Sequence, residues 1–190
     1  MLIVAITGMP GAGKSTAAKA LEARGYKRIV MGDVVREETR RRGMEPDPAN
    51  TGKVMLELRE KHGAGAVAEV CLQLLKSLKD EVVVIDGIRS MAEVDVFGRA
   101  GSVKLLAIQA SRGRRFQLLA ERGRSDAPAS RASFDDRDSR ELSIGVGNAI
   151  ALSDETLSNE HTTPEELGNR VVELVDSWVK SIGRNPRQRR

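Results

Sequence analysis

The sequence predicts an α/β fold of three layers, with a parallel sheet between two layers of helices. A glycine-rich motif at residues 8–16 lies between an apolar run and a helix-forming segment. A second apolar run, at residues 82–85, ends in an aspartate. Segments typical of strands and of helices alternate along the rest of the chain, which is the pattern of an α/β domain.

The glycine-rich motif reads GMPGAGKST and fits the template G-x-x-x-x-G-K-[ST] at every position. Residues 1–6 before it predict a strand buried on both faces, and residues 14–24 after it favour a helix that ends near Gly25. This order of strand, loop and helix predicts a P-loop, which binds nucleotide phosphates. The residues expected to bind the nucleotide are Gly8, Met9, Pro10, Gly11, Ala12, Gly13, Lys14, Ser15 and Thr16.

Each part of this loop has an expected chemical role. The glycines leave backbone N–H groups open to phosphate oxygens, and the helix N-terminus adds partial positive charge. Lys14 is expected to reach the β- and γ-phosphates, and Ser15 to place its hydroxyl on Mg²⁺. Asp86, at the end of the second apolar run, matches the Walker B pattern and predicts a second group that orders Mg²⁺. The predicted cofactors are therefore ATP and Mg²⁺.

Composition predicts one domain over residues 1–183 of the 190, with an aliphatic core because aromatic residues make up only 3 %. No apolar run approaches the ~20 residues that a membrane span needs. The absence of a signal-peptide pattern and the presence of a single cysteine predict a reducing, cytoplasmic location. Cys71 lies on a helical apolar stripe with Val70 and Leu74, which predicts a buried thiol.

The net charge of +4 is concentrated at the carboxyl end. Residues 184–190 hold four arginines and no acid, which leaves 27 basic and 27 acidic residues in the rest of the chain. The sequence thus predicts a neutral body with a basic, disordered tail. The sequence disfavours nucleic acid as a partner. The basic tail is the only feature of the sequence that leaves nucleic-acid binding possible.

The segment after the P-loop helix carries a first candidate for binding a phosphoryl acceptor. Residues 27–31 predict a second strand, and Asp33 is placed to cap the helix that follows. Arg36 falls in the first turn of that helix, where a cation is unfavourable unless an anion binds nearby. We therefore expect Arg36 to bind an acceptor phosphate, with a solvated surface arginine as the alternative.

Between the second and third strands, residues 43–66 predict a helical excursion that forms one wall of an acceptor site. Prolines and glycines in residues 43–53 end one helix, and further helices are expected over residues 51–62 and 64–78. Arg89 follows the strand that carries Asp86, so it emerges at the carboxyl end of the sheet, where open α/β sheets bind ligands.

An arginine-rich lid is predicted over residues 112–140. Eight arginines and no lysine lie between Ser111 and Glu141, and the planar fork of arginine suits phosphate binding. Arg124 is the first choice for neutralising the transferring phosphoryl group, with Arg122 and Arg137 as further candidates. Because aspartates interleave with these arginines, solvated ion pairs are the alternative for about half of them.

The last third predicts a strand over residues 103–109, a helix over 142–152, a short strand over 155–158 and a final helix capped by Thr163. The two histidines, His62 and His161, lack Cys or carboxylate partners at ligand spacing and do not predict a transition-metal site.

Taken together, the P-loop, the Gly32-Asp33-x-x-Arg36 stretch and the Asp86-Gly87-Ile88-Arg89 stretch resemble the adenylate kinase and dephospho-CoA kinase branch of P-loop kinases. The chain is most similar to a family of archaeal proteins related to adenylate kinase, which shares these stretches and the run from Arg137 to Asp154. The resemblance covers nearly the whole chain. It implies a five-stranded parallel sheet of order 2-3-1-4-5 and an ATP site at the P-loop, but no particular substrate.

The leading functional prediction is transfer of the γ-phosphoryl group of ATP to a nucleoside monophosphate or a similar small phosphorylated acceptor. One alternative is a hydroxyl kinase of the dephospho-CoA kinase type, for which Asp33 is the candidate base. Another is a nucleotide-gated or RNA-associated ATPase. The sequence leaves the oligomeric state and the choice between ATP and GTP open.

Overall fold

A computed structural model describes residues 1–122, 128 and 130–183. Within them, five parallel strands form one sheet in the order β2-β3-β1-β4-β5, which confirms the predicted 2-3-1-4-5 topology. The strands are β1 (Leu2–Thr7), β2 (Lys27–Val30), β3 (Val82–Ile88), β4 (Ser102–Gln109) and β5 (Glu155–Ser158). β1 lies at the centre and all six of its residues are buried, as its unbroken apolar run predicts.

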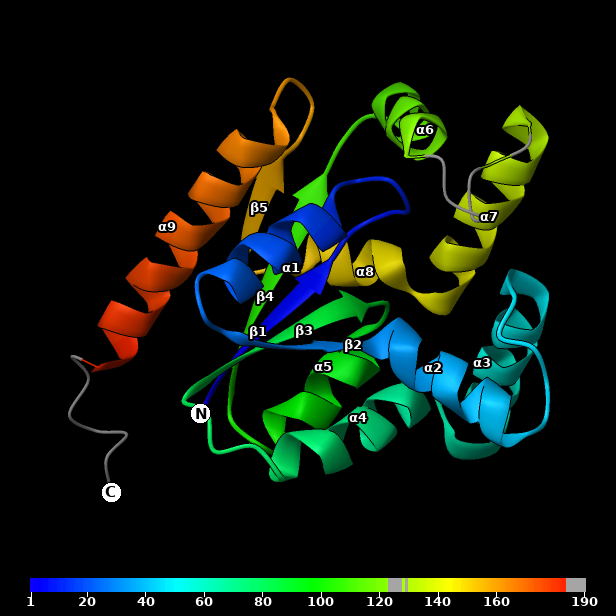
Figure 1. Cartoon of the computed structure of the whole chain (residues 1–190), viewed down its shortest axis with the longest axis horizontal. Coiled ribbons are helices and arrows are strands. Elements are labelled where there is room, and N and C mark those ends of the chain that lie inside the picture. The colour runs from blue at the N-terminus through cyan, green and yellow to red at the C-terminus, as the bar shows by residue number, and fades with distance from the viewer. Residues whose placement is uncertain (123–127, 129, 184–190) are drawn as a thin grey trace.

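The helices lie on the two faces of the sheet and beyond its carboxyl edge (Figure 1). They are α1 (Lys14–Ala23), α2 (Met31–Arg41), α3 (Pro48–His62), α4 (Ala66–Lys76), α5 (Met91–Gly98), α6 (Arg112–Glu121), α7 (Arg131–Ile144), α8 (Val146–Ala151) and α9 (Pro164–Gly183). In Figure 1, α2 and α3 lie on the same side of the molecule as α6 and α7, with the P-loop end of the sheet between the two pairs.

The core consists of two aliphatic clusters, one on each face of the sheet. On one face, α1 and α9 pack on the strands through residues such as Leu21 and Val171. On the other face, α4 and α5 pack through residues such as Leu75 and Phe97. Cys71 is fully buried in this second cluster, and desolvation raises the pKa of its thiol to about 12, so it is an inert core residue.

Several element boundaries differ from the predicted ones. α3 begins at Pro48, because Asp47 caps it by accepting a hydrogen bond from the Asn50 N–H at 2.7 Å. The single helix expected over residues 142–152 is instead the end of α7 and a separate α8, divided at Gly145 with φ 112°. Val70 and Leu74, expected on the buried stripe of α4, are 42 % and 50 % exposed. None of the described helices is long and apolar enough to span a membrane.

Candidate functional site

The loop between β1 and α1 has the backbone that its glycines predict. Gly8, Gly11 and Gly13 have φ of 145°, 81° and 106°, values that favour glycine. A Cβ atom on Gly8 would lie 2.3 Å from the Ile108 carbonyl oxygen, and one on Gly13 would lie 2.5 Å from the amide nitrogen of Asn159. Both the dihedral angles and the close neighbours therefore require glycine in this loop.

Two side chains from distant parts of the sequence hold the loop in place. The buried guanidinium of Arg115 on α6 donates to the Pro10 carbonyl oxygen at 3.0 Å. It also binds both carboxylate oxygens of Asp138 on α7, at 2.8 and 2.6 Å. Asn159, which follows β5, donates from its side-chain amide to the Ala12 carbonyl oxygen at 3.0 Å. The loop is thus fixed by the α6–α7 pair on one side and by the β5–α9 connection on the other.

Lys14 is folded back over its own loop. Its ammonium donates to the carbonyl oxygens of Gly8 and Met9, at 2.7 and 3.1 Å. Desolvation lowers its pKa to about 8, while the negative charges of Glu141 and Asp86 oppose that shift. Because Arg89 and Arg137 also act on this pKa, the β3–α5 turn and α7 both place charged groups near the P-loop lysine.

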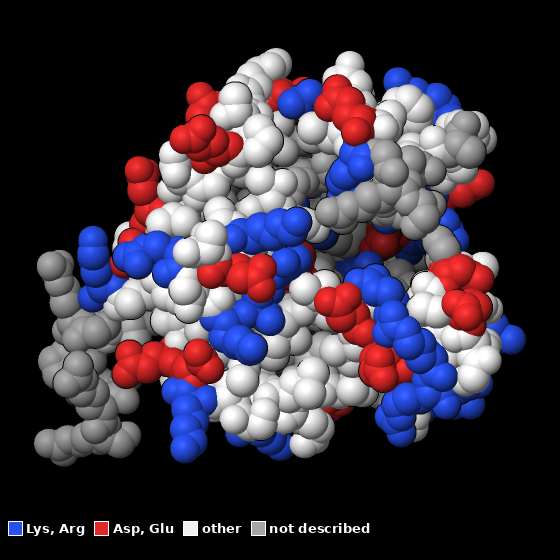
Figure 2. Space-filling model, viewed as in Figure 1, with Lys and Arg blue, Asp and Glu red and all other residues white. Residues whose placement is uncertain are grey.

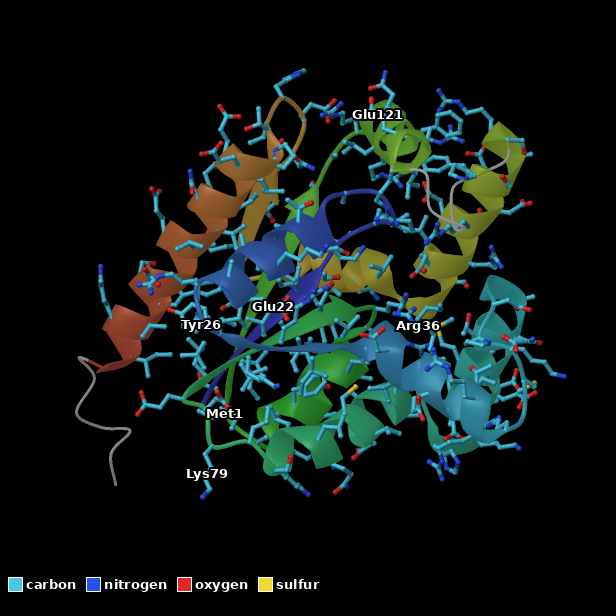
Figure 3. The ribbon with its side chains drawn as sticks, viewed as in Figure 1. Met1, Glu22, Tyr26, Arg36, Lys79 and Glu121 are labelled. Carbon is cyan, nitrogen blue, oxygen red and sulfur yellow. The ribbon has the colours of Figure 1, made fainter. Side chains whose placement is uncertain are left out.

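Asp86 lies at the end of β3, beside Ile6 of β1, so it is close to the start of the loop. Its carboxylate is buried and accepts a hydrogen bond from Arg28 of β2 at 2.6 Å. Arg28 in turn contacts Glu22 of α1 at 3.3 Å, on the face of the sheet shown in Figure 3. Sequence reasoning missed Arg28, because nothing in its spacing shows that a β2 side chain reaches across to β3.

The donor set near Lys14 fits a magnesium ion bound together with nucleotide phosphates. Ser15 offers a hydroxyl and Asp86 a carboxylate, both hard oxygen donors, which Mg²⁺ prefers. The described residues contain no cluster of three or more His, Cys, Asp or Glu side chains that would hold a metal without a substrate. Few protein ligands are what a nucleotide-bound Mg²⁺ needs, since it keeps its waters and the phosphates as partners.

Arg89 and Glu141 form an ion pair at the carboxyl edge of the sheet, with Nε and Oε2 2.8 Å apart. Burial disfavours the charge on Arg89, but the neighbouring Glu141 carboxylate outweighs this effect and raises its pKa. Burial likewise disfavours the charged form of Glu141, and Arg89 and Lys14 outweigh it, so the pKa of Glu141 is lowered. Both groups therefore stay charged at neutral pH.

Asp33 and Arg36 differ from the expectation. Asp33 does not cap α2, which begins at Met31 with Val30 at the capping position. Asp33 lies instead in the first turn, where its side chain is 63 % exposed and pairs with Arg36. Figure 3 shows Arg36 near the start of α2, and Figure 2 shows a hollow on this face of the molecule with basic and acidic side chains along its walls.

A pocket of about 290 Å³ lies next to the P-loop, and Arg89 is not among the residues that line it. Its walls include Ser15 and Thr16 of α1, Arg114 and Arg122 from the α6 side, and Asn159 and Pro164 from the β5–α9 side. Asn159 follows β5 and lines this pocket. Its side-chain amide is already bonded to Ala12, so in this pocket it serves the loop.

Known proteins place the chain in a family. Residues 7–134 match the AAA domain family. The UPF0200 protein of Thermococcus onnurineus is 43 % identical over 180 residues, covering 92 % of this chain and 97 % of its own length. The chain belongs to the UPF0200 family. The UPF0200 protein of Methanocaldococcus jannaschii is 42 % identical over 185 residues, covering 95 % of this chain and 94 % of its own length.

Solved structures show that this UPF0200 chain has a P-loop kinase fold. TT1252 from Thermus thermophilus has a TM-score of 0.68 at 20 % identity, covering 93 % of this chain and 96 % of its own. Shikimate kinase from Acinetobacter baumannii, solved with shikimate, has a TM-score of 0.58 at 16 % identity and covers 93 % of each chain. At these identities the likeness concerns the fold alone.

Not every predicted site residue of this UPF0200 chain is placed. Arg124 lies outside the described residues, as does most of the predicted lid segment from Arg122 to Pro128 and the whole tail of residues 184–190. Arg115, one of the eight arginines of the predicted lid, is a buried support of the P-loop. The sequence contains one signal of this role: Asp138, the carboxylate that pairs with Arg115, is among the acidic residues interleaved with the arginines.

Proposed function

We propose that the protein transfers the γ-phosphoryl group of Mg·ATP to a small phosphorylated acceptor, with nucleoside monophosphates as the first candidates. The observation that carries this proposal is the glycine-built loop with the Lys14 ammonium folded over it, next to the charged groups of the Arg89–Glu141 ion pair. Arg89, from the acceptor side of the sheet, and Arg137, from α7, both act on the Lys14 ammonium. With Glu141 and Asp86 as the opposing charges, the cluster keeps a net positive charge that suits phosphate groups.

In this proposal, one set of residues binds the phosphoryl donor and another set binds the acceptor. Lys14 and the loop N–H groups bind the β- and γ-phosphates, while Ser15 and Asp86 hold Mg²⁺. Arg36 and Arg89 bind the acceptor phosphate. Arg124, with Arg122 or Arg137, neutralises charge on the transferring group. An acceptor that is already a phosphate anion needs no general base, which is why no strongly basic carboxylate is required next to it.

The pocket beside the P-loop supports a nucleotide as the phosphoryl donor. Its volume of about 290 Å³ is close to the lower end of small-molecule sites, about 300 Å³. Its walls combine arginine and proline side chains with the first turn of α1, so a base and ribose placed there would lead directly to the loop.

The test is a coupled assay of ADP formation with each nucleoside monophosphate in turn. Lys14→Ala is expected to lower turnover about 10³-fold, because the lysine neutralises phosphate charge in the transition state. Lys79→Ala is the matched control, since Lys79 is an exposed lysine away from the loop and should leave turnover unchanged. Turnover that survives Lys14→Ala would refute the assignment.

The second candidate is transfer to a hydroxyl group. The fold likeness to shikimate kinase supports this candidate. A hydroxyl acceptor benefits from a base, and Asp33 is an exposed carboxylate on the acceptor side. Asp33→Asn separates the two candidates. Hydroxyl phosphorylation should fall about 10²-fold or more, whereas transfer to a phosphate should change little.

A further inference from the structure

Two buried arginines of this chain are bonded in different ways. Arg115 makes three hydrogen bonds, one to each oxygen of Asp138 and one to a backbone carbonyl, and none of its nitrogen atoms is buried without a partner. Arg59 of α3 also has a side chain that is only 10 % exposed, but it makes a single bond, from Nη2 to Glu93 Oε1 at 2.6 Å. Its Nε and Nη1 atoms are buried and have no hydrogen-bond partner.

The reason for the single bond is the geometry of Glu93. This carboxylate is fully buried in the first turn of α5, and its second oxygen, Oε2, accepts the backbone N–H of Arg89 at 2.6 Å. Glu93 therefore divides its two oxygens between Arg59 and the Arg89 backbone, whereas Asp138 offers both of its oxygens to Arg115. The Nε hydrogen and both Nη1 hydrogens of Arg59 are left for another acceptor.

Arg59 is also in the right place for a ligand. α3 belongs to the excursion between β2 and β3, on the side of the sheet that faces the predicted acceptor site. Through Glu93, Arg59 lies two hydrogen bonds from the backbone of Arg89. The Arg89 side chain forms an ion pair with Glu141, and the negative charge of Glu141 acts to raise the pKa of Lys14. Hydrogen bonds and an ion pair thus connect Arg59 with Glu141, whose negative charge acts on the P-loop lysine.

We propose that Arg59 binds the phosphate group of the acceptor, so that this group lies between α3 and the turn that carries Arg89. This inference rests on the proposed function for the identity of the ligand. Buried guanidinium N–H groups without an acceptor are unfavourable, and a planar arginine fork matches the oxygens of a phosphate. Arg36 is a weaker anchor, because it is 44 % exposed and paired with Asp33.

The experiment uses protein with ¹⁵N-labelled arginine, saturated with Mg²⁺ and a non-hydrolysable ATP analogue so that the P-loop is filled. Inorganic phosphate is titrated in, with sodium chloride at equal ionic strength as the reference. The Nε–H signal of Arg59, assigned through bonds to its own backbone, should shift in a saturable way with phosphate and not with chloride. The Nε–H signal of Arg99, an exposed arginine paired with Glu69, should not move. A stationary Arg59 signal overturns the proposal.

A pair of variants gives a second reading. Arg59→Lys keeps the charge opposite Glu93 but loses the fork, so phosphate should bind about tenfold more weakly. Arg99→Lys is the matched control and should bind phosphate normally. With AMP as acceptor, Arg59→Lys should raise KM for AMP and leave the affinity for the ATP analogue unchanged. An unchanged KM for AMP, or an equal loss for both nucleotides, counts against the proposal.

The outcomes separate this inference from the proposed function. If phosphate shifts Arg59 and no nucleoside monophosphate is phosphorylated, the anion site stands and the proposed acceptor is wrong. If monophosphates are phosphorylated and Arg59 does not respond, the kinase assignment stands and this site is wrong.

Discussion

The nucleotide side and the acceptor side of the proposed site are held in different ways. The P-loop receives backbone-directed hydrogen bonds from Arg115 and Asn159, both buried and both far away in sequence. On the acceptor side, the side chains of Arg89 and Arg36 each pair with one carboxylate, Glu141 and Asp33, while Glu93 holds the backbone of Arg89. Main-chain anchors fix a loop in one conformation, whereas a single ion pair can be exchanged for a phosphate without disturbing the backbone. We therefore expect the P-loop backbone to keep its conformation when a nucleotide binds, and the ion pairs of Arg89 and Arg36 to be exchanged for an acceptor phosphate.

The largest expected effect comes from breaking the support of the P-loop. Arg115→Ala leaves Asp138 as an uncompensated buried charge, so it should destabilise the fold by about 3–5 kcal/mol in thermal or urea unfolding. Arg112→Ala is the matched control, because Arg112 pairs with Asp135 across the same two helices but is 60 % exposed. It should change the free energy of unfolding far less than Arg115→Ala, because solvent screens an exposed ion pair. Equal losses in the two variants would contradict the idea of a buried anchor.

A smaller loss is expected on the other side of the loop. Asn159→Ala removes the donor to the Ala12 carbonyl, which is buried, and should lower the free energy of unfolding by about 2 kcal/mol. The affinity for an ATP analogue, measured by calorimetry, should fall with it. Asn169→Ala, on the exposed part of α9, should leave both quantities as they are. Wild-type affinity in Asn159→Ala would show that the loop does not need this anchor.

The titration of Lys14 tests the donor side without a variant that destabilises the fold. Because its pKa in the nucleotide-free chain is about 8, Lys14 is charged below that pH and loses its charge above it. Affinity for the ATP analogue should therefore decline above pH 8, approaching about tenfold per pH unit if binding requires the ammonium. Lys14→Arg stays charged throughout this range, so its affinity should show no such decline. A flat wild-type profile from pH 7 to 10 would contradict the assigned pKa.

The acceptor side should give the smallest effect, and in the opposite direction. Glu141→Gln removes a negative charge next to Lys14 and Arg89, so anionic nucleotides should bind a few-fold more tightly at low salt. Asp135→Asn, on the exposed face of the same helix, is the control and should change affinity much less. Weaker binding in Glu141→Gln than in the control would mean that the carboxylate helps to build the site.

The fold was predictable from local signals because β1, β3 and β4 each contain a compact apolar run. The motif around Lys14 and the strand ending in Asp86 carry fixed spacings, and the topology follows from the resemblance they support. The failed prediction at Asp33 is also local. A helix begins wherever backbone bonding begins, and here that is two residues earlier, at Met31.

The partners of the site residues could not be predicted in the same way. Arg28 reaches Asp86 across 58 positions, and Asn159 reaches Ala12 across 147. The burial of each arginine in the folded chain decides whether it holds the P-loop or is available to a ligand. Arg112 and Arg115 lie close together in the sequence, on the same helix. The packing of α6 on α7 leaves Arg112 exposed and buries Arg115.

The bond from Asn159 to Ala12 has a consequence for biosynthesis. The P-loop leaves the ribosome before its anchors, because Arg115 and Asn159 are translated more than a hundred positions after the backbone groups that they bind. A nascent chain that stops before Asn159 carries the full nucleotide motif without the side chain that fixes it. We therefore expect an ATP analogue to protect from protease only those nascent chains in which Asn159 has left the ribosome.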